Sequence, residues 1–351
     1  MLLRYWFVME TIGITAIFAF FLLRVLRSVK RNKANPIVPP KTLGGRVGFG
    51  LLYILRIIAV GLGTFLVIAL FVMVERNIYS VITETRPTPS EVSIPAGLPF
   101  EVEEVTFEGG DNLRMAGWQV PSQNGATVIL LHGYGGNRTR MLWHAHRLVR
   151  AGYGVLMYDE RASGESEGTY RSYGWEDPRD VQGAVRFIET ESGRDGGQIG
   201  IVGCSIGAQI ALQSTAYYPE IGAVWADGPS SVRARDLPPP KDPIVALVVL
   251  GNYSLDWLFE ISLDIDAPAP MIEIIGNIFP RPIMLVGGGQ PHPLVGSEGE
   301  NMVPRYAHYA GSNAQIWIIP EAYHCDGPAH RPDEYAERMV AFFDTAFGIT
   351  R

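Results

Sequence analysis

Cysteine is scarce in this sequence, which contains only Cys204 and Cys325 among its 351 residues. A disulfide framework of the kind that holds small secreted domains together is therefore excluded, and the fold must depend on a hydrophobic core. Internal repeats and low-complexity tracts are also absent. No group of His, Cys, Asp and Glu has the spacing of metal ligands, so we expect neither a metal site nor a cofactor.

Positive charge is scarce beyond residue 76. Residues 1–76 contain ten Lys and Arg against two acids, a net charge of +8. The whole chain carries −7, so residues 77–351 carry −15. An acidic body of this kind argues against nucleic acid as a partner.

Two long apolar runs lie in the basic N-terminal part. They cover residues 6–23, interrupted by Glu10, and residues 57–74, which contain no charge. Each has roughly the length that a helix needs to cross about 30 Å of hydrocarbon. A pair of buried core helices is the alternative, but residues 57–74 lack the polar face that such a helix normally has. We therefore expect residues 1–76 to form a two-helix membrane anchor.

The loop between these runs indicates how the anchor is oriented. Seven Lys and Arg residues and no acid lie between residues 24 and 46. The positive-inside bias places this loop in the cytoplasm, so both termini and everything after Arg76 face the extracytoplasmic side. Residues 77–100 are polar and include Pro87 and Pro89, which predicts a linker between the anchor and the body.

Strand-like and helix-like segments alternate from residue 101 to the end of the chain. The turn signal at residues 109–112 predicts a hairpin of residues 101–107 and 113–120. Further strands are predicted at residues 127–131, 155–158, 199–203, 223–225, 283–286 and 315–319, and helices at 178–191, 207–217, 302–309 and 334–347. This order predicts an α/β fold with a mainly parallel sheet and helices on both faces.

The motif Gly203-Cys204-Ser205-Ile206-Gly207 directly follows an apolar strand and directly precedes a helix. G-x-S-x-G in this position is typical of a nucleophile elbow, in which two glycines leave room for a serine on a sharp turn. The helix N-terminus behind it offers free N–H groups to a developing oxyanion. We therefore interpret Ser205 as a nucleophile, with an ordinary tight turn as the alternative.

Two glycine-containing motifs precede the elbow. Residues 132–136 (His-Gly-Tyr-Gly-Gly) follow the first buried strand, where a glycine-rich turn can present a backbone N–H to the nucleophile; a simple β-to-α turn is the alternative. Residues 158–168 (Tyr-Asp-Glu-Arg-Ala-Ser-Gly-Glu-Ser-Glu-Gly) form the other motif.

Together the three motifs resemble the alpha/beta-hydrolase family, in particular its bacterial esterase-like and serine-aminopeptidase-like members. The resemblance covers residues 101–349, and it departs from the usual pattern at Ala162 and Ala208, where glycine is common. It implies that Ser205 is the nucleophile. It also implies that the oxyanion hole consists of the N–H of Ile206 and that of Tyr134 or Gly135.

The family's order of serine, acid and histidine predicts a late base. His324 fits, because the sequence Pro320-Glu321-Ala322-Tyr323-His324 resembles the family's P-x-A-x-H ending. His330 and His292 are the rival histidines.

The acid stays open. The slot after residue 286, where the family usually places Asp, contains no carboxylate. Glu298 is nearest to that slot. Glu300 is the first alternative, although with Ser297 it also forms a helix capping box. Asp227, after the strand at 223–225, is the second alternative.

Residues 228–280 form an interval that is far longer than a usual connection. In this fold an insertion here forms a cap over the active site. Its apolar segments, residues 244–250 and 257–259, suggest an acyl or lipid-like substrate, unless they only pack the cap onto the core.

The pairing of Cys204 with Cys325 is also open. One cysteine precedes the nucleophile and the other follows the base, so catalytic geometry would bring their backbones together. Against pairing, neighbouring strand residues point to opposite faces.

The expected function is a membrane-anchored serine hydrolase that cleaves carboxylic esters of apolar acyl groups. An amide or peptide hydrolase of the same fold is one alternative. A non-catalytic, membrane-tethered binding module is the other, because the usual acid is missing. The sequence does not decide the oligomeric state.

Overall fold

A computed structural model describes residues 42–192, 198–291 and 302–350 of the chain. The chain divides into a unit that ends at Phe71 and a unit from Val72 to Arg351. Helix α2 (Leu43–Glu84) crosses this boundary. The first predicted membrane span, residues 6–23, lies outside the described residues.

Helix α2 accounts for nearly all of the described residues of the N-terminal unit, 42–71. Among the described residues, α2 is the one helix that is long and apolar enough to cross a membrane. Large apolar side chains such as Leu51, Ile57 and Phe65 are exposed along it. A helix that is apolar on all sides needs apolar surroundings. Its surface therefore suits lipid, and α2 includes the predicted span at residues 57–74.

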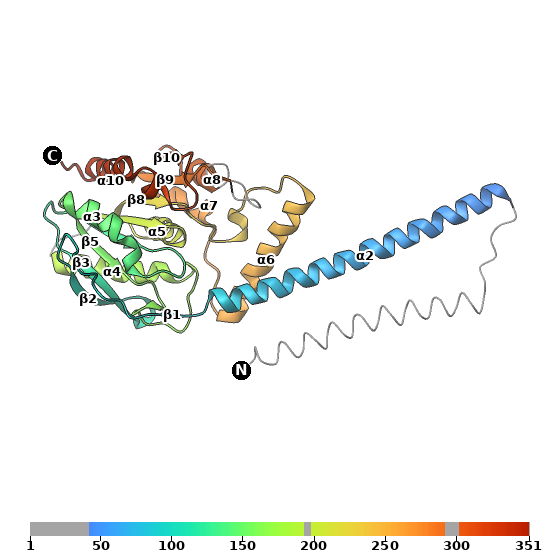
Figure 1. Ribbon diagram of the computed structural model, residues 1–351, viewed down its shortest axis with the longest axis horizontal. Helices are drawn as coiled ribbons and strands as arrows, with labels where there is room; N and C mark the ends of the chain where they lie inside the picture. The colour runs from blue at the N-terminus through green and yellow to red at the C-terminus, as the bar shows by residue number, and fades with distance from the viewer. Residues whose placement is uncertain (1–41, 193–197, 292–301, 351) are drawn as a thin grey trace. The chain divides into compact units, whose positions relative to one another are not determined.

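The second unit is built on a sheet that has eight strands within the described residues, in the order β10-β9-β8-β7-β4-β5-β3-β2 (Figure 1). The strands are β2 (Glu103–Glu108), β3 (Arg114–Val120), β4 (Thr127–Leu131), β5 (Gly154–Tyr158), β7 (Ile199–Cys204), β8 (Ile221–Asp227), β9 (Ile283–Gly288) and β10 (Ala314–Ile319). β2 pairs antiparallel with β3, and β3 with β5, while the pairs from β5 through β4 to β10 are parallel. The predicted hairpin and the mainly parallel sheet are thus confirmed.

Helices cover both faces of this sheet. They are α3 (Leu142–Arg150), α4 (Asp177–Ser192), α5 (Ile206–Tyr217), α8 (Met302–Ala310), the short α9 (Gly327–His330) and α10 (Pro332–Phe347), with 3₁₀ turns η1 (Gly110–Asn112) and η2 (Arg138–Met141). Residues of α3 and α10 belong to one core cluster, and residues of α4, α5 and α8 belong to the other. The four helices that the sequence predicts after residue 101 are found, with ends that differ by a few residues.

The two cores follow from strand alternation. In β4, Val128 and Leu130 enter the core under α3 and α10, whereas Ile129 and Leu131 enter the core under α4 and α5. Successive side chains of a strand point to opposite faces, so an uninterrupted apolar strand suits a sheet covered on both sides. Each such buried side chain stabilises the fold by roughly 1.5–3 kcal/mol. Because β4 pairs in parallel with β7, the carboxyl ends of these two strands lie side by side.

The predicted linker differs from what the structure shows. Residues 77–84 continue helix α2, and β1 (Thr88–Pro89) pairs in parallel with β6 (Ser163–Gly164). The Thr88 N–H donates to the carbonyl of Ala162 at 2.7 Å. The polar, proline-bearing composition favours a loop, but it carries no information on a pairing partner that lies 75 residues away. The segment is thus attached to the body.

The long interval between β8 and β9 contains four short or medium helices within the described residues. They are η3 (Ala234–Asp236), α6 (Pro243–Leu263), α7 (Met271–Ile274) and η4 (Ile275–Ile278). Helix α6 lies beside the last turns of α2, where the Asn77 side-chain amide donates to the Gly251 carbonyl at 2.5 Å (Figure 1). The insertion that the sequence predicts is therefore present, and α6 is its main element.

Candidate active site

Ser205 occupies the turn between β7 and α5, as the motif predicts. Its backbone is in the left-handed region, with φ 59° and ψ −120°. A non-glycine residue in such a conformation costs on the order of 1–3 kcal/mol and persists only where its surroundings hold it. Here the Ser205 N–H donates to the carbonyl of Asp227 at 2.9 Å, at the end of the neighbouring strand β8. Ser205 thus lies in a turn just beyond the carboxyl end of β7, at the edge of the sheet where the parallel strands end.

The two glycines of the motif are required by close backbone approach. A methyl group on Gly203 would lie 2.1 Å from the carbonyl oxygen of Gly207. A methyl group on Gly207 would lie 2.5 Å from the carbonyl oxygen of His132. Neither position tolerates a side chain, so the motif has the physical basis that the sequence analysis assigned to it.

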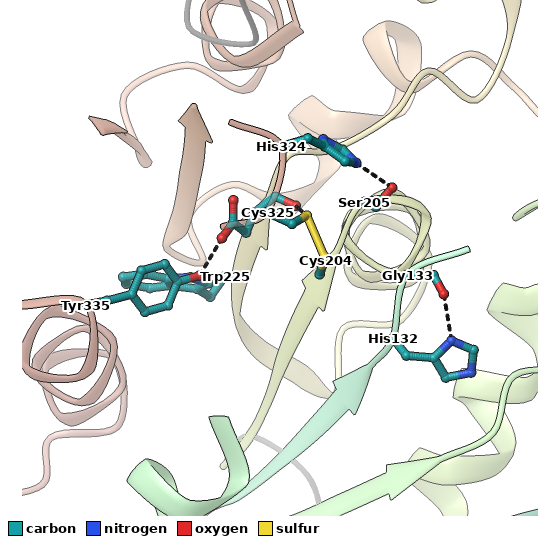
Figure 2. The surroundings of a disulfide bond; sticks show 9 residues. His132, Gly133, Cys204, Ser205, Trp225, His324, Cys325 and Tyr335 are labelled. Atoms are coloured by element: carbon teal, nitrogen blue, oxygen red, sulfur yellow. Dashed lines mark hydrogen bonds between the residues drawn. A yellow bond between two sulfur atoms is a disulfide. The ribbon is translucent and has the colours of Figure 1, made fainter. Parts of the chain in front are cut away.

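His324 lies next to Ser205. Its Nε2 is 2.8 Å from the Ser205 Oγ, across 119 residues of sequence (Figure 2). The turn after β10 delivers this histidine to the same edge of the sheet. The rival His330 instead contacts the Asp326 carboxylate at 3.2 Å, and His292 lies outside the described residues. The geometry therefore pairs Ser205 with the histidine that the sequence favours.

The three carboxylates proposed as the acid have different standing. Glu298 and Glu300 lie outside the described residues. Asp227 ends β8 with its side chain buried, and its Oδ2 accepts a hydrogen bond from the Tyr335 hydroxyl at 2.8 Å. That hydroxyl in turn accepts from the Trp225 indole at 2.8 Å (Figure 2). Asp227 is thus engaged by an aromatic network beneath the sheet edge.

Cys204 and Cys325 form a disulfide with their Cα atoms 6.0 Å apart (Figure 2). The bond ties the residue before Ser205 to the residue after His324. The objection from strand alternation does not apply, because β7 ends at Cys204 and the left-handed turn at Ser205 breaks the alternation. A single covalent link therefore joins the two loops that carry Ser205 and His324.

His132 holds the turn that the sequence assigns to the oxyanion hole. Its Nε2 accepts the Glu160 N–H at 3.1 Å, so its Nδ1 carries the proton and donates to the Gly133 carbonyl at 2.9 Å (Figure 2). Burial lowers the pKa of this histidine, which favours the neutral ring that the two bonds require. A methyl group on Gly133 would lie 3.5 Å from Ser205 Cβ, so the turn passes directly beside Ser205.

Tyr134, Gly135 and Ile206, the residues predicted to form the oxyanion hole, line one cavity of about 20 Å³. Such a volume holds about one water molecule. Glu160 lines the same cavity, and burial together with the nearby carboxylates of Asp177 and Asp180 raises its pKa well above the usual range. The predicted oxyanion residues thus surround one small cavity.

The motif at residues 158–168 has a structural role. Asp159 accepts the Arg138 backbone N–H at 2.7 Å and pairs with the Arg138 guanidinium, both buried. Arg161 pairs with Asp180 of α4 at 2.7 Å. Ala162, where glycine is usual, adopts φ 56°. These contacts hold the loop after β5 against η2 and α4. These elements lie on either side of residues 132–136, which we call the oxyanion turn after the role predicted for them.

Arg171 is a site residue that the sequence analysis missed. Its guanidinium lies 4.2 Å above the Tyr134 ring and donates to the Tyr134 hydroxyl at 3.0 Å. It also donates to the carbonyl of Arg86 at 2.7 Å, while its backbone N–H donates to the carbonyl of Thr85 at 2.9 Å. Arg171 therefore joins the end of α2 to the oxyanion turn. No motif surrounds it, so no local signal indicates this role.

The described residues contain no cluster of His, Cys, Asp and Glu able to hold a metal ion.

Comparison with known proteins agrees with this architecture. Residues 122–267 match the family model of serine aminopeptidase, S33. The uncharacterized protein YfhR of Escherichia coli strain K12 is 26% identical over 256 residues, which cover 71% of this chain and 82% of that protein.

Solved structures with the same arrangement include enzymes. The Pyrococcus furiosus esterase Pf2001 has a TM-score of 0.58 and 24% identity, and the match covers 75% of this chain and 98% of that one. The alpha/beta hydrolase GrgF from Penicillium sp. sh18 has a TM-score of 0.56 and 15% identity, and the match covers 71% of this chain and 100% of that one. These likenesses show that the second unit of this chain has the alpha/beta-hydrolase fold.

Proposed function

We propose that this protein is a membrane-anchored serine hydrolase that cleaves carboxylic esters of apolar acyl groups. The observation that carries the proposal is the contact of 2.8 Å between Ser205 Oγ and His324 Nε2 at a strained elbow. A serine hydroxyl is a weak nucleophile unless a base accepts its proton, and this distance is within hydrogen-bond reach. The esterase among the structural relatives is consistent with this chemistry.

In the proposed reaction Ser205 Oγ attacks the ester carbonyl carbon while His324 Nε2 takes the hydroxyl proton. The N–H groups of Ile206 and of Tyr134 or Gly135 stabilise the oxyanion of the tetrahedral intermediate. Collapse of the intermediate expels the alcohol, which receives the proton from His324. Water then attacks the acyl-serine while His324 takes a proton from it. The second tetrahedral intermediate collapses, Ser205 Oγ receives the proton from His324, and the carboxylic acid is released.

A carboxylate orients His324 in this scheme and stabilises it when it becomes cationic. Glu298 is our first choice because it lies nearest to the usual slot, with Glu300 and Asp227 as alternatives. The hydrogen bond from Tyr335 to Asp227 gives that carboxylate another role in the fold.

The anchor is proposed to consist of the spans at residues 6–23 and 57–74, with the catalytic domain outside the cytoplasm. The exposed apolar surface of α2 supports the second span. The disulfide is consistent with an oxidising compartment, since disulfides persist mainly there.

Labelling with a fluorophosphonate probe tests the proposal, because such a probe reacts with an activated serine. The full-length protein in detergent should be labelled, and Ser205→Ala should not, while Ser122→Ala, which removes an exposed hydroxyl on the body, should be labelled like the wild type. An unlabelled wild type would instead favour the non-catalytic binding module. Acyl esters and amides of graded chain length then separate ester from amide hydrolysis.

A further inference from the structure

Helix α6 of the cap has an apolar face that no described residue covers. Leu250, Tyr253, Trp257 and Ile261 are each about half exposed or more, from 49% to 59%, and we call these four residues the outer face of α6. Their spacing of three and four residues places them on one side of a helix. Four large apolar side chains in one stripe are more than the scattered exposure that a soluble surface normally shows.

The opposite side of α6 faces the body. Phe259 is buried in a cluster with Val81 of α2 and Trp175. Its ring lies 5.9 Å from that of Tyr173, which in turn lies 5.7 Å from the ring of Tyr134. Two aromatic contacts therefore connect the inner side of α6 to the oxyanion turn.

The position of α6 along α2 indicates what covers the outer face. A methyl group on Gly251 would lie 3.2 Å from the Met73 sulfur, so the two helices touch at this point. The buried Asn77 amide donates to the Gly251 carbonyl and to the Ser254 hydroxyl, the latter at 2.7 Å. Met73 belongs to the last turn of the predicted span at residues 57–74, where a membrane helix reaches the lipid interface.

We propose that the outer face of α6 lies in the outer interface of the same membrane that α2 crosses. Tyr and Trp are the residues that membrane interfaces favour, because an apolar ring and a polar tip suit the headgroup level. The residues that precede this contact, 243–250, contain no charge. An exposed apolar side such as this gains stability when it is buried at the boundary between headgroups and acyl chains, because binding strength scales with the apolar area buried there.

The inference rests on the proposed membrane anchor, and where it narrows the substrate class it also rests on the proposed hydrolase activity. A cap helix with lipid on one side and the oxyanion turn two rings away on the other would admit acyl esters from the bilayer. The substrate would then be a lipid ester that partitions into membranes rather than a small soluble ester.

Fluorescence in proteoliposomes tests the membrane contact without reference to catalysis. Full-length wild type, Trp257→Phe and Trp143→Phe are reconstituted in phosphatidylcholine vesicles with ordinary or brominated acyl chains. The intensity lost on bromination should fall in Trp257→Phe and stay unchanged in Trp143→Phe, since Trp143 packs against Tyr335 in the body. An equal loss in wild type and Trp257→Phe overturns the proposal, including the case in which a second copy of the chain covers this face.

Hydrolysis by variants tests the substrate class. Ile261→Glu should cleave a long-chain acyl ester embedded in vesicles about tenfold more slowly than wild type, because a charge at the boundary weakens interfacial contact. A soluble short-chain ester should be cleaved at the wild-type rate, and the exposed β10 control Ile316→Glu should match wild type on both. Equal rates of Ile261→Glu and wild type on the vesicle ester would overturn the substrate inference. A wild type inactive on both esters would overturn the proposed function and leave the quenching result to decide the membrane contact.

Discussion

Three carboxylates are candidates for one role beside His324, and Asp227 is the candidate whose surroundings the structure describes. Asp227 already accepts a hydrogen bond from Tyr335, and its backbone carbonyl holds Ser205. Its side chain therefore contributes to the frame of the site whether or not it contacts the base.

We predict that Glu298→Gln lowers kcat by two orders of magnitude or more with an unchanged melting temperature, because the amide cannot stabilise a cationic His324. Glu300→Gln should mainly lower stability, by about 1 kcal/mol, through loss of a cap. Steady-state kinetics and thermal unfolding of both variants and of Asp227→Asn provide the check. A greater loss of kcat in Asp227→Asn than in Glu298→Gln would move the role to Asp227.

His144 of α3 is a buried histidine that lies apart from Ser205 and His324. Burial lowers its pKa to about 4, because a charged ring is disfavoured in the core. The unfolded chain, with a histidine pKa near 6.5, binds a proton first as the pH falls. Its contribution to stability is therefore present above pH 6.5 and lost as the pH falls toward 4.

We predict that this loss amounts to about 3 kcal/mol, from 1.36 kcal/mol per pKa unit. His132 shifts in the same direction, so only a comparison isolates His144. The difference in unfolding free energy between wild type and His144→Phe, measured by denaturant titration, should change by that amount between pH 7 and pH 4. Parallel curves for the two proteins would contradict the assignment.

At the scale of elements, the disulfide connects two loops that are separated by 121 residues. A bond that closes so long a loop stabilises a fold mainly by restricting the unfolded chain, by roughly 5 kcal/mol in the entropic account. Because the bond joins the neighbours of Ser205 and His324, it also restrains the distance between them.

Reduction with dithiothreitol should therefore lower the unfolding free energy of the wild type by roughly 5 kcal/mol and reduce turnover. The double variant Cys204→Ala, Cys325→Ala supplies the matched control, because it has no cysteine left and its stability should not respond to the reductant. Equal unfolding midpoints of oxidised and reduced wild type would show that the bond contributes little.

A second connection between elements joins the end of α2 to the oxyanion turn. Arg171 bonds the carbonyl of Arg86 and lies against Tyr134, so it is a positioning residue for the turn. The planar guanidinium makes these contacts together, and lysine cannot reproduce them.

We predict that Arg171→Ala lowers kcat about tenfold with a small change in KM, since a misplaced donor affects the transition state most. Arg171→Lys should restore little of this activity. Arg179→Ala, which removes an exposed arginine on α4, should leave kcat unchanged. A change in KM alone on Arg171→Ala would assign this arginine to substrate binding instead.

At the scale of the whole molecule, an uneven distribution of charge determines the expected topology. Residues 1–76 carry +8, concentrated between the two predicted spans, whereas the body is acidic. The positive-inside bias acts on short loops close to the spans, which is the arrangement here.

In a bacterial host, alkaline phosphatase fused after Arg351 should be active, and the same enzyme fused after Lys41 should be inactive. Green fluorescent protein at the two positions should give the opposite result, because it fluoresces only when it folds in the cytoplasm. If the phosphatase fusion after Arg351 is inactive and the green fluorescent protein fusion at the same position is fluorescent, the topology is the reverse of the predicted one.

Local patterns alone determined most of the sheet, the helices and the elbow. Apolar strands such as residues 127–131, the glycines at 203 and 207, and the place of His324 after a strand are properties of short segments. Their physics is local, since a glycine is needed where an added methyl group would lie only 2.1 or 2.5 Å from a backbone carbonyl oxygen. Such requirements leave a trace in the sequence next to the residue that needs them.

Contacts between distant segments were decided only by the tertiary structure. Thr88 pairs with Ser163, Asn77 with Gly251, Arg171 with Tyr134, and Cys204 with Cys325. None of these pairs has a periodicity or a turn signal, because each depends on where the sheet places two loops in space. The attachment of residues 85–92 to the body, the disulfide and the joint between α2 and the cap therefore emerge only once the chain is folded.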